Sequence, residues 1–302
     1  MRIGKLIEKY FWLVLVAGII IGLLNPYPVV MGKYLPKILL GLMLFFVFLK
    51  IDAIEILENI RNYRLMIYIA FVYMFIIPLL FFLPLNLFDA DLATGILLLT
   101  AMPAGVSTPA LADIVKGNIS FSMSLAIVSQ LVAPFTVPLL FWMIDVKGLE
   151  INKLLVFRDI ALLIFLPMII SQFFKRLFPA AVKKIQHFST SANILLLFTF
   201  VYIAISSQRN VILENPSSLI WKIFLLYIVF ILLHFIGYVA YFKGTRESRI
   251  SVAIGAAYMN NGMAIVLAAA YFKPEIVVLM VLSELPWNTL LEPFRRVINY
   301  FN

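Results

Sequence analysis

Two short polar segments interrupt long apolar runs of this sequence, and they carry the residue types best suited to binding a solute. The first runs from Met102 to Pro109 and contains two prolines, a glycine, Ser107 and Thr108; the second is Met259-Asn260-Asn261-Gly262. Proline removes a backbone donor and clashes with the preceding helical turn, and Asn and Gly are poor helix formers. We therefore predict broken helices at Met102 to Thr108 and at Met259 to Gly262.

Each break predicts an anion-binding environment. A helix that begins inside a membrane directs its unpaired backbone amides and the positive end of its dipole into the break. If helices begin at Thr108 and Met263, two such ends converge, and the hydroxyls of Ser107 and Thr108 and the amides of Asn260 and Asn261 would orient a bound carboxylate. The simpler alternative for the asparagines is hydrogen bonding between packed helices.

Other polar residues lie within the apolar runs. Glu284 lies near the centre of the last run, where an acid is a candidate proton carrier, cation ligand or ion-pair partner. It could instead accept a structural hydrogen bond where Pro286 bends the helix. His234 stands alone on an apolar helix, which is more typical of packing than of proton relay. Ser122 and Ser129 are best interpreted as part of a stripe of small residues that packs against another helix. A ligand role for Ser122 is the second interpretation.

The composition places these segments in a membrane. Hydrophobic residues make up 64% of the 302 residues and charged residues 13%, a composition outside the range of water-soluble domains. The net charge of +9 comes from Lys and Arg that flank the apolar runs, so we expect no nucleic-acid binding. The absence of cysteine excludes disulfides, thiolate metal sites and thiol nucleophiles.

Long apolar runs predict an all-α integral membrane protein with ten transmembrane helices. The first run, within Met1 to Leu24, lacks a small-residue cleavage site and is expected to be retained. The spans are Tyr10 to Leu24, Tyr34 to Leu49, Leu65 to Leu83, Leu92 to Val115, Ser120 to Ile144, Asp159 to Phe174, Ala192 to Ser207, Leu219 to Phe242, Ser248 to Tyr271 and Pro274 to Phe294.

The distribution of basic residues predicts the orientation of the chain. Of the 24 Lys and Arg residues, 16 lie at the two ends of the chain and in the connections that follow even-numbered spans. Cytoplasmic loops carry the excess of Lys and Arg, so both termini are expected in the cytoplasm. The chain is then a multi-pass protein of the cell inner (plasma) membrane.

The two halves of the chain, residues 1–150 and 151–302, show a weak internal repeat. An offset of 157 aligns both breaks and, after each, a Lys followed by a helix breaker, namely Pro103 with Asn260, Gly105 with Gly262, Lys116 with Lys273 and Gly117 with Pro274. Five spans in each half force the second copy to insert upside down relative to the first. Inverted repeats with paired broken helices are typical of secondary transporters.

At these residues the chain resembles bacterial-type members of the bile acid:sodium symporter family. The resemblance is carried by Pro103 to Thr108, by Lys116-Gly117-Asn118, by Val128-Ser129-Gln130-Leu131 and by Asn260 to Ala264. It implies a core domain of spans three to five and eight to ten, in which the broken fourth and ninth spans cross. Spans one, two, six and seven would form a panel domain, and motion between the two domains would give alternating access.

The resemblance also implies positions for sodium ligands and for the substrate. The family's sodium ligands fall on Tyr73, Thr108, Pro109, Ser122, Ala126, Gly255 and Met259. Only Ser122 and Thr108 keep a matching hydroxyl, and no carboxylate or carboxamide completes the oxygen shell that a hard cation needs. We therefore doubt sodium coupling and expect no cofactor. The substrate-facing asparagines of the family match Asn260 and Asn288.

We predict a secondary transporter of a small organic anion, bile-acid-like or carboxylate-bearing, whose coupling is sodium-independent or linked to protons through Glu284. The alternatives are a sodium-coupled symporter with a degenerate site, using Ser122 and Thr108, and a non-transporting sensor or a channel on the same scaffold. The sequence has no nucleotide-binding loop, His-rich metal cluster or nucleophile with a base, so we expect no enzyme. The expected partners are the solute and the lipid bilayer, and a monomer is plausible.

Overall fold

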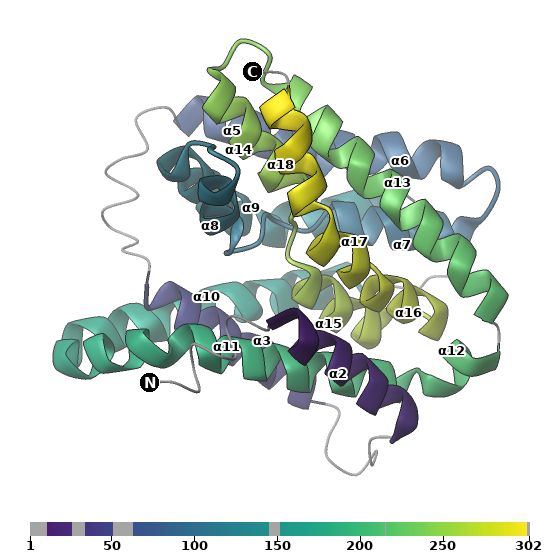
Figure 1. The fold of residues 1–302 in the computed structure, drawn as a ribbon, viewed down its shortest axis with the longest axis horizontal. Coiled ribbons are helices and arrows are strands. Elements are labelled where there is room, and N and C mark those ends of the chain that lie inside the picture. The colour runs from purple at the N-terminus through teal and green to yellow at the C-terminus, as the bar shows by residue number, and fades with distance from the viewer. Residues whose placement is uncertain (1–10, 26–33, 51–62, 145–151, 215, 301–302) are drawn as a thin grey trace. The chain divides into compact units, whose positions relative to one another are not determined.

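The computed structural model describes residues 11–25, 34–50, 63–144, 152–214 and 216–300 (Figure 1). Both ends of the chain, with Arg2, Lys5 and Lys9, lie outside the described residues. In the described residues all regular elements are helices. The chain divides into two compact units: the first unit is Met1–Asn59 with Asp159–Glu214, and the second unit is Ile60–Arg158 with Asn215–Asn302. Each unit takes segments from both halves of the sequence.

The first unit is organised around one long helix. It contains α2 (Phe11–Leu24), α3 (Leu35–Phe48), most of α10 (Lys153–Leu177), α11 (Pro179–Ser207) and α12 (Arg209–Glu214). α11 packs against both α2 and α3. Gly22 of α2 allows this approach, because a Cβ added there would lie 2.9 Å from the side chain of Ile205. A buried acid, Asp159 of α10, forms an ion pair with Lys37 of α3.

Side chains also satisfy the last carbonyls of two helices in the first unit. The Gln186 side chain donates to the Leu49 carbonyl at 2.7 Å, directly after α3. The Arg209 guanidinium donates to the Leu23 carbonyl at 2.7 Å, in the last turn of α2. The final carbonyls of a helix have no partner within the helix, and the hydrocarbon region of a membrane offers no water to hydrogen-bond with them. The Gln186 and Arg209 side chains provide these hydrogen bonds instead.

The second unit holds both helix breaks. Its helices are α5 (Tyr63–Phe71), η2 (Val72–Ile76), α6 (Ile77–Leu85), α7 (Ala90–Thr100), α8 (Thr108–Ile114), α9 (Ile119–Met143), the start of α10, α13 (Pro216–Ala240), α14 (Arg246–Ala257), α15 (Asn261–Tyr271), α16 (Pro274–Leu282), α17 (Glu284–Thr289) and α18 (Leu291–Tyr300). α6 packs on α7 and α13 packs on α14. α8 packs on α9 and α14, and α15 packs on α16 and α7.

Capping side chains start three helices of the second unit. Asp89 accepts from the Leu92 amide at 2.9 Å before α7, Asn118 accepts from the Phe121 amide at 2.9 Å before α9, and Thr245 accepts from the Ser248 amide at 3.3 Å before α14. Such caps replace the missing partners of the first helical amides. They fix the ends of the helices that lead into or away from the breaks.

Five helices in the described part of the chain are long and apolar enough to span a membrane. They are Arg64–Leu85, Ile119–Met143, Leu154–Leu177, Pro179–Ser207 and Leu219–Ala240. A sixth candidate, Pro274–Thr289 with Leu291–Tyr300, is bent by 41° at its break. These correspond to the third, fifth, sixth, seventh, eighth and tenth spans of the prediction. The seventh begins at Pro179 instead of Ala192, because the helix continues through a polar stretch before its apolar part.

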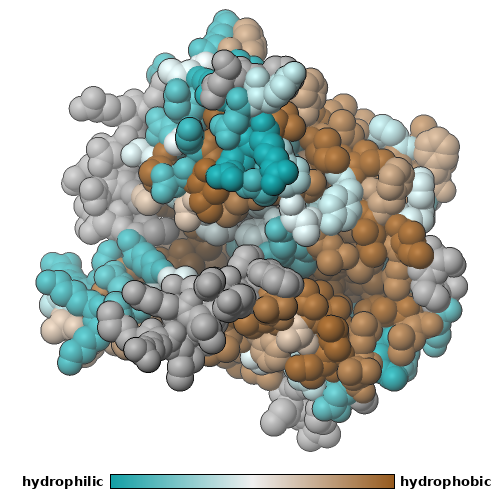
Figure 2. All heavy atoms as spheres, viewed as in Figure 1, coloured by the Kyte–Doolittle hydropathy of each residue, from teal (hydrophilic) through white to brown (hydrophobic). Residues whose placement is uncertain are grey.

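Large apolar side chains cover much of the outer surface. Phe135, Trp142 and Phe235 are each more than half exposed, on α9 and α13. Figure 2 shows broad hydrophobic areas on the visible face, with hydrophilic surface gathered mainly over α18 and around the lower edges. Exposed apolar area on this scale is expected where the surrounding solvent is lipid. The protein is therefore an integral membrane protein.

Candidate functional site

The two predicted breaks lie in the second unit. Residues 101–107 separate α7 from α8, so the first break starts and ends one residue before the predicted Met102 to Thr108. Residues 258–260 separate α14 from α15, so the second break starts one residue earlier than Met259. Asn261 and Gly262, which the sequence places in the break, already belong to the first turn of α15. Asn260 makes this early start possible by capping the helix.

The two breaks are paired with each other through their backbones. Ala104 and Met259 form an antiparallel bridge, in which the Gly105 amide donates to the Tyr258 carbonyl at 2.8 Å and the Asn260 amide donates to the Pro103 carbonyl at 2.8 Å. Gly105 is required for this approach, because a Cβ there would lie 2.9 Å from the Tyr258 carbonyl oxygen. Each break thus satisfies polar backbone groups of the other, as a low-dielectric interior demands.

Side chains from two neighbouring helices hold the paired breaks. Ser129 of α9 accepts from the Ala104 amide at 3.2 Å, and Gln130 directs its amide nitrogen to the Ala104 carbonyl at 3.5 Å. Trp287 of α17 donates to the Met259 carbonyl at 3.2 Å. The sequence analysis names Ser129 as part of a packing stripe and of a family motif, Gln130 as part of the motif alone, and Trp287 not at all. The sequence feature that could have identified these three residues is a polar side chain at a helix position where the apolar pattern predicts burial.

Two of the predicted ligand side chains hold the breaks themselves. Thr108, fully buried, donates to the Gly105 carbonyl at 2.7 Å. The Asn260 side-chain oxygen accepts from the Met263 amide at 3.1 Å and caps α15. Ser107 is half-buried and precedes α8 without a side-chain cap. The Asn260 oxygen is therefore already in use, and only its amide nitrogen is left to contact a solute.

Asn261, Glu284 and Asn288 form a polar cluster next to the second break. Asn261 is 4% exposed, and neither its oxygen nor its nitrogen has a hydrogen-bond partner among the described residues. It lies beside the Glu284 carboxyl, close enough to interact but outside hydrogen-bond geometry. Asn288 donates to the Glu284 carboxylate at 3.1 Å and to its backbone carbonyl at 2.7 Å. The Asn288 oxygen is left without a partner among those residues.

Glu284 lies within the helical stretch Pro274–Thr289, directly after Ser283, the one residue between α16 and α17, whose backbone is also helical. α16 ends at Leu282 and α17 begins at Glu284, with Pro286 in its first turn. The Glu284 side chain is 7% exposed, and no Lys, Arg or His in the described part of the chain forms an ion pair with it. A buried carboxyl without a cationic partner is a candidate for proton or cation exchange.

The positions that the family resemblance assigns to sodium ligands offer few oxygens. Tyr73 lies in the π-helical turn η2, beside the Ser129 side chain and the Ala104 backbone amide. The buried Ser122 hydroxyl has no partner among the described residues. The other positions carry no side-chain oxygen besides that of Thr108; Gly255, for example, packs against Leu125. In the described residues no three His, Cys, Asp or Glu side chains gather where they could hold a metal ion.

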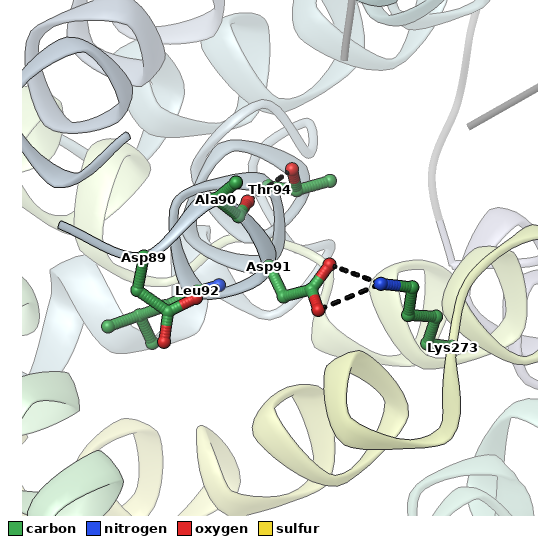
Figure 3. Close-up of polar contacts among 6 residues, drawn as sticks. All are labelled: Asp89, Ala90, Asp91, Leu92, Thr94 and Lys273. Atoms are coloured by element: carbon green, nitrogen blue, oxygen red, sulfur yellow. Dashed lines mark hydrogen bonds and ion pairs between the residues drawn. The ribbon is translucent and has the colours of Figure 1, made fainter. Parts of the chain in front are cut away.

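The turns that follow the two half-helices dock on the opposite broken helix. After α8, the Asn118 amide donates to the Glu247 carbonyl at 3.1 Å, and Ser251 donates to the Asn118 carbonyl at 2.8 Å. After α15, Lys273 donates to both carboxylate oxygens of Asp91 at 2.9 Å (Figure 3). The hydrogen bond and charge of Asp91 raise the pKa of Lys273. The ends of α8 and α15 are thereby fixed to α14 and α7.

His234 is buried and packs against aromatic side chains. Its Nδ1 lies 2.7 Å from the Phe230 carbonyl of its own helix. Its ring lies edge-on to Tyr258 at 5.3 Å and against Phe294 at 4.5 Å. Tyr258 also contacts Trp287 edge-on at 5.4 Å. This aromatic group, His234, Tyr258, Trp287 and Phe294, forms the wall behind the second break.

Comparison with known proteins shows which proteins the sequence is similar to. The sequence profile of the SBF-like CPA transporter family matches residues 9–288. A protein of Bacillus subtilis (strain 168), described as the uncharacterized sodium-dependent transporter YocS, is 26% identical over 245 residues. That alignment covers 78% of this chain and 74% of the relative. The family match includes both breaks, the polar cluster and all the positions assigned to sodium ligands.

Proposed function

The chain belongs to the SBF-like CPA transporter family, and on this premise we propose that it is a secondary transporter that moves a small organic anion by alternating access. The observation that carries the proposal is the Asn261 carboxamide, which is buried beside the paired breaks and has no partner among the described residues. A buried amide without partners costs free energy unless a ligand or water completes it. Its nitrogen would donate to a solute carboxylate.

We propose that the two halves of the chain are inverted repeats. The offset of 157 moves the bounds of α7 onto residues 247–257, and α14 occupies Arg246–Ala257. It moves α9 onto residues 276–300, the region of α16, α17 and α18. The contacts support this correspondence, since α9 packs on α14 and α16 packs on α7. Paired broken helices in such repeats are the usual binding region of secondary transporters.

We further propose that the second unit is the core domain and the first unit the panel domain. The second unit contains the helices expected as spans three to five and eight to ten, and the first unit those of spans one, two, six and seven. Backbone pairing between the breaks favours a core that moves as one body. Solute bound at Asn261 would then reach either side of the membrane through motion of the core against the panel.

Glu284 is the proposed coupling residue. It lies beside Asn261 and accepts from Asn288, so an anion bound to the Asn261 amide nitrogen would lie close to the carboxyl. Two like charges at short distance in a low-dielectric site repel, and protonation of Glu284 removes the repulsion. Solute and proton would therefore bind together and be released together, which is proton-coupled symport.

Sodium coupling is the second candidate. It is favoured by the description of the Bacillus relative as sodium-dependent and by the unpartnered hydroxyl of Ser122. A sodium ion held there would need several main-chain carbonyls, since the neighbouring positions Ala126, Gly255 and Pro109 offer no side-chain oxygen.

Transport by the purified protein in proteoliposomes distinguishes these possibilities. Uptake of a panel of small carboxylates would be measured under four conditions: a proton gradient, a sodium gradient, both, and neither. We expect saturable counterflow, with net uptake driven by the proton gradient. Uptake that follows only the sodium gradient would replace the proton mechanism with the sodium mechanism. Flux that does not saturate would indicate a channel, and no flux for any solute would indicate a sensor.

A further inference from the structure

An apolar groove lies on the second unit between α13 and the last two helices. Its volume is about 500 Å³, within the range of pockets that hold a small molecule. One face of α13 supplies Ile231, His234 and Phe235, at the spacing of successive helical turns. The facing wall comes from Leu290, Phe294 and Val297. The walls of the groove are thus two parallel rows of mostly aliphatic and aromatic side chains.

The groove is open along its length and has a defined direction. Its lips are apolar and exposed: Ile231 is 54% exposed, Phe235 65% and Val297 54%. From Ile231 to Tyr238 the groove follows α13 for about 10 Å, at 1.5 Å per residue. Because the lips lie on a helix that spans the membrane, the medium beside them is lipid.

One end of the groove is basic. The Arg246 guanidinium lines it and donates to the Ile298 carbonyl in the last turn of α18 at 2.7 Å. The Arg249 guanidinium lies 4.0 Å from the ring centre of Tyr238, which also lines this end. Residues 243–249 and 291–300 carry five basic and two acidic side chains, a net charge of +3. Figure 2 shows the resulting hydrophilic surface over α18. An anionic group is the complementary occupant of this end.

His234 lines the groove with a buried imidazole ring. The Phe230 carbonyl only accepts, so His234 Nδ1 carries the proton and Nε2 is the acceptor of the neutral ring. Nε2 has no hydrogen-bond partner among the described residues. This nitrogen is itself buried, so it does not face an occupant, and His234 serves the groove as part of its wall.

We propose that this groove binds one anionic phospholipid of the surrounding bilayer, with its phosphate against Arg246 and an acyl chain along α13 and α18. Basic pockets between membrane helices are suited to anionic headgroups, and the apolar walls suit a hydrocarbon chain. The lipid would also lie against the wall of the second break, since His234 packs on Tyr258, whose carbonyl receives the Gly105 amide. The bound lipid would support the break without entering the solute site.

Native mass spectrometry of the full chain tests this proposal. The protein would be released from detergent after equilibration with phosphatidylglycerol or with phosphatidylcholine of the same acyl chains. We expect one tightly retained phosphatidylglycerol and no equivalent phosphatidylcholine. Arg246→Gln should weaken retention roughly tenfold or more, because a hydrogen bond to a charged group is lost. Val297→Trp should block the groove from an exposed position, where the change leaves the core packing intact.

Lys222→Gln is the matched control, because it removes the same charge from α13 near its other end, outside the groove. Retention by this variant should equal that of the unmodified protein. Equal retention of the two lipids would overturn the proposal, as would unchanged retention in both Arg246→Gln and Val297→Trp. Retention of the transported solute in place of phospholipid would reassign the groove to the transport pathway and equally overturn the lipid assignment.

Discussion

At the scale of single residues, the two adjacent asparagines of the second break have different roles. Asn260 caps α15 through its side-chain oxygen, whereas Asn261 has a buried carboxamide that makes no hydrogen bond within the described residues. Asn260→Ala should therefore lower stability by about 1 kcal/mol, the usual effect of losing an N-cap. Asn261→Ala should leave the unfolding temperature unchanged or raise it, because it removes an unsatisfied buried polar group.

For transport, in contrast to stability, we expect the substitution of Asn261 to have a large effect. If its carboxamide binds the solute carboxylate, Asn261→Ala should reduce uptake at least about tenfold, the effect of losing one hydrogen bond to a charged group. Thermal unfolding in detergent and uptake into proteoliposomes, measured on the same preparations, separate the two effects. Normal uptake by a stable Asn261→Ala protein would remove this residue from the site.

Glu284 gives the clearest test of coupling. Glu284→Gln keeps the size of the side chain and an oxygen that accepts from Asn288, but the amide exchanges no proton. We expect the variant to fold normally and to lose uptake driven by a proton gradient, while solute exchange at equal pH continues. Glu275→Gln, an exposed acid in the first turn of α16, is the matched control and should keep the gradient response. A preserved gradient response in Glu284→Gln would contradict proton coupling through this residue.

Much of the site at this scale was predictable, because polar residues within apolar runs are conspicuous in the sequence. The sequence did not reveal which polar atoms already form hydrogen bonds within the protein. The division between Asn260 and Asn261 depends on where the backbone becomes helical, a difference of one or two residues. The roles of Ser129 and Trp287 depend on which helices pack against the breaks, and that requires the tertiary structure.

At the scale of the elements, the close pairing of the two breaks depends on a glycine. Gly105→Ala would place a methyl group 2.9 Å from the Tyr258 carbonyl oxygen, where the contacting atom is backbone and has little freedom to move. We expect a loss of stability of about 1–3 kcal/mol from this overpacking, and a larger loss of uptake as the breaks separate.

Gly41→Ala is the control for the intrinsic effect of adding a methyl group to a helix. Nothing lies within 4 Å of a Cβ at Gly41 in α3, so the substitution should stabilise the helix by about 0.5–1 kcal/mol. Chemical or thermal unfolding of both variants gives the comparison. If Gly105→Ala behaves like Gly41→Ala, the breaks are not held as closely as their backbone hydrogen bonds indicate.

The ends of a helix were predictable where the apolar run ends at the same residue as the helix. They were less predictable where the helix continues beyond the apolar run. α9 begins and ends within one residue of the prediction. α11 starts at Pro179, well before the predicted Ala192, because a window that counts apolar residues ignores the polar turns of a helix that extends beyond the hydrocarbon. The last span bends by 41° between Thr289 and Leu291, a few residues after Pro286, the residue at which the sequence suggests a bend.

At the scale of the whole molecule, hydropathy predicted a helical membrane protein, because hydrocarbon leaves few other ways to satisfy the backbone. The second unit combines residues 60–158 with residues 215–302, segments that hydropathy alone does not connect. They are joined by the packing of α14 on α8 and α9 and of α15 and α16 on α7, together with the bridge between Ala104 and Met259. If the core moves as one body during transport, this bridge should persist through the whole cycle.

A disulfide across the bridge tests that requirement. Residues facing each other at such a position have Cα atoms about 4.5 Å apart, within the range that a disulfide accepts. Because the chain has no cysteine, Ala104→Cys with Met259→Cys introduces a unique pair. We expect the pair to oxidise equally well with and without solute and with either direction of the coupling gradient. Ala104→Cys with Ala264→Cys is the control, since no bridge joins those positions. Oxidation of the bridge pair in only one of these conditions would show that the breaks separate during transport, and the rigid-core mechanism would then have to be abandoned.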